Sequence, residues 1–157
     1  MSKRKRFMDT PSGWVLRATF NVVSPGALLF ALAVGILGLI AGWPDRVSGH
    51  PHHLMDDIHG SYLGWATVLV LSSVIGLYGE FIKSPVVSGF GLGAVSVWYF
   101  GIGFSLFFDS LDAGFREYNT TDLTAMVFTL ACLYLFMSAL RVYAIKLGPS
   151  PGGPDVR

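Results

Sequence analysis

The chain has 157 residues, of which 52% are hydrophobic and 13% charged, and its formal net charge is +1. A soluble domain of this length carries about 25% charged residues, so the composition argues against a soluble globular protein. We expect a lipid bilayer to be the solvent of a single, largely apolar domain.

Residues 1–24 combine a basic run with an amphipathic segment. The basic run consists of Lys3, Arg4, Lys5 and Arg6. At an anionic lipid surface each of these would contribute about 1 kcal/mol, and we interpret the run as a positive-inside signal rather than a nucleic-acid contact. Thr10 is a candidate N-cap before Pro11, and Trp14, Ala18 and Val22 follow at intervals of four. This pattern predicts a short helix in the cytoplasmic interface.

Four apolar runs are long enough to cross a bilayer, which takes roughly 20 residues of helix. They cover residues 25–43, 61–81, 86–108 and 123–145. Unpaired backbone groups in hydrocarbon cost several kcal/mol each, so the spans must be helical. The sequence therefore predicts an all-α, polytopic integral membrane protein with four transmembrane helices in a bundle. Residues 146–157 are rich in Pro and Gly and predict a disordered cytoplasmic tail.

Ionisable residues lie near the ends of these spans, and the middle of every span is free of charge. Glu80 ends the second run, and Arg141 lies near the end of the fourth, where we expect its side chain to snorkel to the lipid headgroups. Four spans place both termini and the loop at 82–85 on one side, and this side holds nine of the eleven basic residues. The positive-inside rule then predicts cytoplasmic N- and C-termini.

Small residues spaced by four predict where the helices pack, because close backbone approach drives association in lipid. The candidate packing positions are Gly35, Gly38, Gly42, Gly60, Gly64, Gly89 and Gly93. They favour a tight bundle, and contact with further copies or other subunits is a second interpretation. Trp98 and Tyr99 fall in the middle of the third span, where we expect them to fill the core rather than stack on a cofactor.

All four histidines fall within ten positions, beside two aspartates. The candidate metal ligands are His50, His52, His53, Asp56 and His59. Imidazole and carboxylate ligands suit Zn, Cu or Ni, so this outer loop is a candidate divalent-metal site. Pro51 interrupts the cluster, and a solvated polar loop, a pH-sensing loop and helix-start chemistry at the aspartates remain alternatives.

Enzymatic motifs are missing from the sequence, since it has no nucleophile elbow, P-loop or cysteine pair. The uncharged span centres disfavour an ion-coupled transporter, which places ionisable residues at mid-bilayer. We therefore expect a non-enzymatic protein without a required cofactor, whose partners are the bilayer and either further copies or a larger membrane complex. An accessory subunit is the first hypothesis. A self-associating protein similar in architecture to multi-span holins is the second, and metal binding or transport through the histidine loop is the third.

Overall fold

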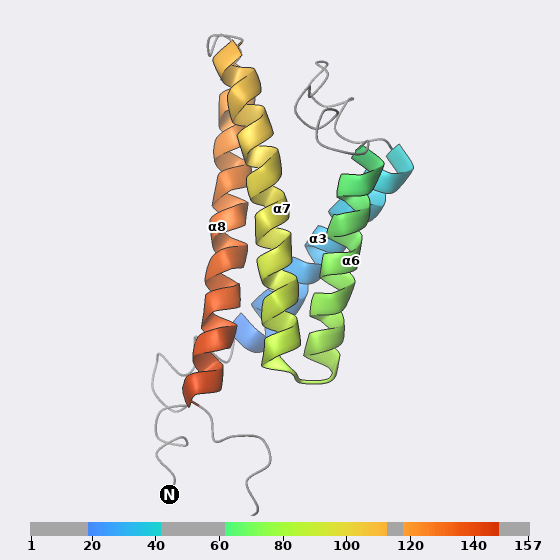
Figure 1. Cartoon of the computed structure of the whole chain (residues 1–157), viewed down its shortest axis with the longest axis vertical. Helices are drawn as coiled ribbons and strands as arrows, with labels where there is room; N and C mark the ends of the chain where they lie inside the picture. Colours follow the sequence, from blue (N-terminus) through green and yellow to red (C-terminus); the bar gives the residue numbers. More distant parts are fainter. Residues whose placement is uncertain (1–18, 42–61, 113–117, 148–157) are drawn as a thin grey trace, which may run out of the picture.

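A computed structural model describes residues 19–41, 62–112 and 118–147, and these residues are helical apart from one short turn (Figure 1). The elements are η1 (Thr19–Val23), a π-helical stretch, followed by the α-helices α3 (Ser24–Ala41), α6 (Tyr62–Phe81), α7 (Pro85–Asp112) and α8 (Tyr118–Leu147). No described residue lies in a strand. The expectation of an all-α protein is confirmed for this part of the chain.

Each of the four predicted spans falls on one helix. The stretches long and apolar enough to cross a membrane are Asn21–Ile40, Leu63–Phe81, Pro85–Phe108 and Asp122–Tyr143. Helices α7 and α8 extend beyond the predicted runs, because α7 continues to Asp112 and α8 begins at Tyr118. The predicted interfacial helix and C-terminal tail fall mainly on residues 1–18 and 148–157, outside the described residues, and stay predictions.

The helices alternate in direction, so the start of α3, the turn between α6 and α7, and the end of α8 lie at one end of the bundle (Figure 1). We call this the turn end. Helix α7 is central: it packs along α6 on one side and α8 on the other, while α3 packs against α6. More than half of the span in α7 is buried, against a third or less in each other helix.

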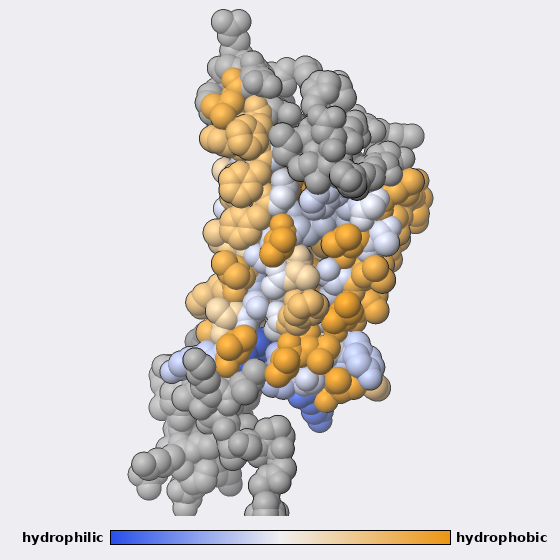
Figure 2. Space-filling model, viewed as in Figure 1, coloured by the Kyte–Doolittle hydropathy of each residue, from blue (hydrophilic) through white to orange (hydrophobic). Residues whose placement is uncertain are grey.

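The buried positions of α3 follow a helical stripe, and they show how the bundle is built. Ser24, Leu28, Ala31, Gly35 and Gly38 are buried, at steps of four and three residues. The remaining residues of the helix are half-buried or exposed and equally apolar, which is typical of a helix whose outer face meets hydrocarbon. Figure 2 shows the same apolar character over both flanks of the molecule.

The turn between α6 and α7 contains a complete helix stop and helix start. Lys83 adopts a positive φ of 55°, and the Lys83 and Ser84 amides donate to the carbonyls of Glu80 and Gly79, at 3.1 and 2.8 Å. These are the two bonds of a Schellman C-cap. Ser84 then acts as the N-cap of α7, its Oγ lying 3.5 Å from the amide nitrogen of Val87, and Pro85 takes the first helical position, where its missing N–H costs nothing.

Candidate functional site: a buried polar network

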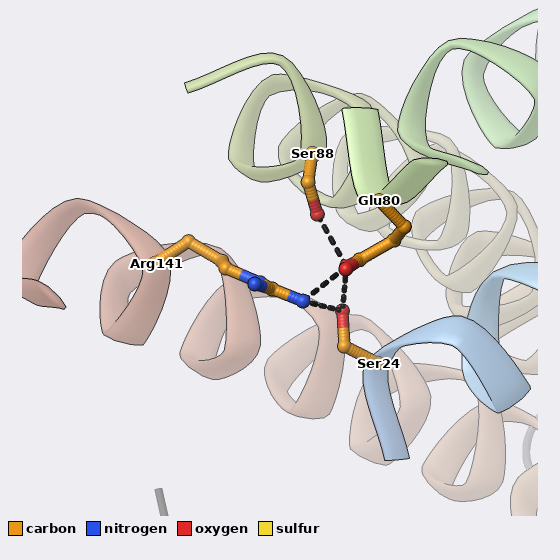
Figure 3. A network of polar contacts seen from close by, with 4 residues as sticks. All are labelled: Ser24, Glu80, Ser88 and Arg141. Atoms are coloured by element: carbon orange, nitrogen blue, oxygen red, sulfur yellow. Dashed lines mark hydrogen bonds and ion pairs between the residues drawn. The ribbon is translucent and has the colours of Figure 1, made fainter. Parts of the chain in front are cut away.

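One side chain from each of the four helices meets at the turn end (Figure 3). Glu80 of α6 is the centre, and its Oε1 accepts hydrogen bonds from Ser24 Oγ of α3 at 2.8 Å and from Ser88 Oγ of α7 at 2.6 Å. Arg141 of α8 forms an ion pair with the same oxygen through Nη2. Nη2 also donates to Ser24 Oγ at 3.3 Å. We call these four residues the polar network.

The polar network is largely withdrawn from solvent, since the side chains of Arg141 and Glu80 are only 11% and 15% exposed. Removing a charge from water costs several kcal/mol per ion, and an ion pair offsets this only when further hydrogen bonds complete it. The two serine hydroxyls supply such bonds. The carboxylate also lies beside the first turns of α3 and α7, where helix N-termini carry partial positive charge. The polar network is thus a hydrogen-bonded ion pair that ties the four helices together.

The expectation that Arg141 snorkels to the headgroups is wrong, because the residue is buried and its guanidinium turns into the bundle. The physical reason is the presence of Glu80 within reach on another helix. A Cβ at Gly89 of α7 would lie only 3.3 Å from Arg141 Cβ. The missing side chain at Gly89 therefore gives the stem of Arg141 room to pass α7.

The described packing glycines differ in what they face. Gly35 and Gly38 of α3 face α6, where a Cβ at Gly38 would lie 3.1 Å from Ala66 Cβ and one at Gly35 would meet the side chain of Val70 at 2.8 Å. Gly89 and Gly93 of α7 face α8, where both approach Ser138. Ser138 Oγ donates to Gly89 O at 2.8 Å. Gly64 has nothing within 4 Å of a Cβ, and Gly42 and Gly60 lie outside the described residues.

The closest helix contact involves glycines that the spacing rule missed. A Cβ at Gly91 of α7 would overlap the backbone of Gly76 of α6, and one at Gly79 would overlap the backbone of Ser88. Gly76 also packs against α3, because a Cβ added to Gly76 would lie 2.6 Å from the side chain of Leu28. No second glycine lies four residues from Gly76, Gly79 or Gly91, so a search for glycine pairs spaced by four overlooks them.

Aromatic residues fill the middle of the bundle. Trp98 and Tyr99 are each 4% exposed, and Trp98 Nε1 donates to the carbonyl of Trp65 on α6 at 2.6 Å. The ring of Tyr99 stacks on that of Tyr134 with centroids 5.4 Å apart. Tyr134 Oη donates to the carbonyl of Ala27, which connects α8 to α3. As expected, Trp98 and Tyr99 belong to the hydrophobic core.

The remaining candidate residues lie in parts of the chain that the structure does not describe. These are the proposed ligands His50, His52, His53, Asp56 and His59, and the basic run Lys3, Arg4, Lys5 and Arg6. Within the described ranges no three His, Cys, Asp or Glu side chains come together. The metal-site hypothesis therefore stays a prediction.

Compared with family models, curated proteins and solved structures, the chain matches none. Its function must therefore be argued from the bundle and the polar network.

Proposed function

We propose that this chain is a four-pass membrane protein that acts through helix packing, as an accessory subunit of a membrane assembly with both termini in the cytoplasm. The observation that carries the proposal is the polar network. It gathers the Glu80 and Arg141 charges inside one copy of the chain and leaves the outer faces apolar.

The exposed hydroxyl groups on α6 and α8 support a lipid-facing or protein-facing exterior. Thr67 and Thr129 are exposed, yet their hydroxyls donate to the carbonyls of Leu63 and Ala125 on their own helices, at 2.7 and 2.8 Å. A hydroxyl that donates to its own helix needs no hydrogen bond from water, so it is compatible with surrounding hydrocarbon. Most other exposed side chains on the four helices are Leu, Val, Ile or Phe.

The same surface disfavours the holin-like alternative. A water-filled lesion needs a wall that offers polar or charged groups to water, and here the charged pair at the turn end faces inward. Self-association through apolar faces would bury those faces without creating such a wall. An apolar exterior on a rigid bundle instead fits a subunit that packs against other transmembrane helices.

Photo-crosslinking from the outer faces tests this proposal in cells. A photoreactive phenylalanine would replace Phe30 of α3, Phe104 of α7 or Phe136 of α8, all about half exposed or more. The matched control carries the probe at Leu92, which is fully buried. We expect one exposed position to give a defined adduct with a different membrane protein, and the control to give none.

Three outcomes would contradict the proposal. A ladder of adducts between copies of the chain, with loss of membrane potential on induction, would support the holin-like alternative. Lipid adducts at all three exposed positions would show that no protein covers these faces. Release of the chain from membranes by alkaline carbonate would reject membrane insertion itself.

A further inference from the structure

The tip of the turn between α6 and α7 contains a cation in an unfavourable backbone conformation. Lys83 has a φ of 55°, in the left-handed region that glycine normally occupies at the end of a helix. Its side chain is exposed. The Schellman C-cap accounts for this backbone conformation, and it leaves the lysine at the tip of the turn.

Exposed apolar side chains flank this cation. The large hydrophobic residue with the greatest exposure in the described chain, Phe81, is 84% exposed two positions before Lys83, and Phe90 is 68% exposed on the first turns of α7. Tyr78, Ile82 and Val86 are exposed in the same region. A lysine surrounded by aromatic and aliphatic side chains is typical of the boundary between lipid headgroups and acyl chains.

The polar network determines the charge that this tip presents. Glu80 lies only three residues before Lys83, but its carboxylate points inward and accepts from Ser24, Ser88 and Arg141. The acidic residue nearest to Lys83 in the sequence therefore forms its hydrogen bonds and ion pair inside the bundle and not with Lys83. Among the side chains that the structure describes at the turn end, Lys83 is the exposed charged group.

We propose that the Phe81–Ile82–Lys83 tip binds the phosphate of an anionic phospholipid, with the ammonium on the headgroup and the flanking side chains among the acyl chains. The inference rests on the proposed membrane insertion. It differs from the predicted role of the basic N-terminus because it places a lipid contact on the folded bundle itself.

The test uses the full chain in lipid nanodiscs that contain equal amounts of phosphatidylcholine and phosphatidylglycerol. Native mass spectrometry measures the ratio of the two lipids that stay bound to the protein. The variant Lys83→Gln removes the charge, Lys83→Arg keeps it, and Lys83→Gly removes both the charge and the backbone strain. We expect Lys83→Gln and Lys83→Gly to lower the preference for phosphatidylglycerol by about fivefold, the effect of one basic residue at an anionic surface, and Lys83→Arg to retain it.

An unchanged lipid ratio in Lys83→Gln would overturn the proposal. The proposal would also be overturned if free glycerol phosphate stabilised the detergent-solubilised protein as much as phosphatidylglycerol does, because that result would assign the site to a soluble phosphate. Carbonate extraction of each variant reports on membrane insertion separately, so a failure there is distinguishable from a failure of lipid selectivity.

Discussion

The two halves of the α6–α7 interface pack in opposite ways. Near the turn, Gly76 and Gly91 bring the two backbones into direct contact. Toward the other end, the Trp65 ring lies between the helices, and its atoms come within 3.3 Å of a Cβ at Gly101. At the turn end Ser88 of α7 donates to Glu80 of α6, which also binds Ser24 of α3 and Arg141 of α8. Among the described residues toward the other end, Trp98 Nε1 of α7 donates to Trp65 O of α6.

This difference shows what close backbone approach makes possible. At the turn end the helices are near enough for short serine side chains to reach Glu80 from α3 and α7. A carboxylate so surrounded can remain charged away from water. Where the Trp65 ring separates the helices, the described contacts are its packing on Gly101 and the hydrogen bond from the Trp98 indole N–H to Trp65 O. The turn end should therefore be the more sensitive half.

The largest effect is expected from separating the ion pair. Arg141→Ala leaves Glu80 buried without its cation and should lower the free energy of unfolding by about 3–5 kcal/mol. The double variant Glu80→Met/Arg141→Met removes both charges and should cost far less. Reversible unfolding in mixed detergent micelles measures both. If the single and double variants lost the same free energy of unfolding, the unpaired charge of Glu80 would not be the cause of the loss.

A smaller effect is expected from filling the glycine contact. Gly91→Ala should destabilise the bundle by about 1–3 kcal/mol, because the added methyl group overlaps the backbone of Gly76 and must push the helices apart. Gly64→Ala is the matched control, since nothing lies within 4 Å of its Cβ. That control should be neutral or slightly stabilising, in line with the higher helix propensity of Ala. Equal losses in the two variants would contradict the packing difference between these positions.

The smallest effect is expected in the tryptophan half. Trp98→Phe keeps an aromatic ring and removes the bond to Trp65 O. The lost bond should cost about 0.6 kcal/mol, the average for such bonds between helices in lipid, and the smaller ring adds a packing loss at this buried position. Ser73→Ala provides a comparison, because its hydroxyl donates within its own helix to Leu69 O, and we expect a smaller change. A loss in Trp98→Phe as large as that in Arg141→Ala would reverse the ranking of the two halves.

Composition and run length were sufficient to predict the four helices. A backbone without access to water must satisfy its own hydrogen bonds, so an uncharged run of this length has one regular solution. The start of α7 at Pro85 follows a local signal as well, since Ser84 caps the helix and proline is favoured at its first position. These features depend on neighbours in sequence, which the chain itself specifies.

The tertiary structure alone decided which residues meet. Glu80 and Arg141 are 61 residues apart, and in the sequence each resembles an ordinary residue at the end of a span. The rotation and tilt of the four helices bring the Arg141 guanidinium onto Oε1 of Glu80. The contact of Gly76 with Gly91 arises in the same way. Helix rotation follows from steric fit between whole surfaces. The small-residue pattern marks packing positions such as Gly35 and Gly89, but it does not say which helix each position meets.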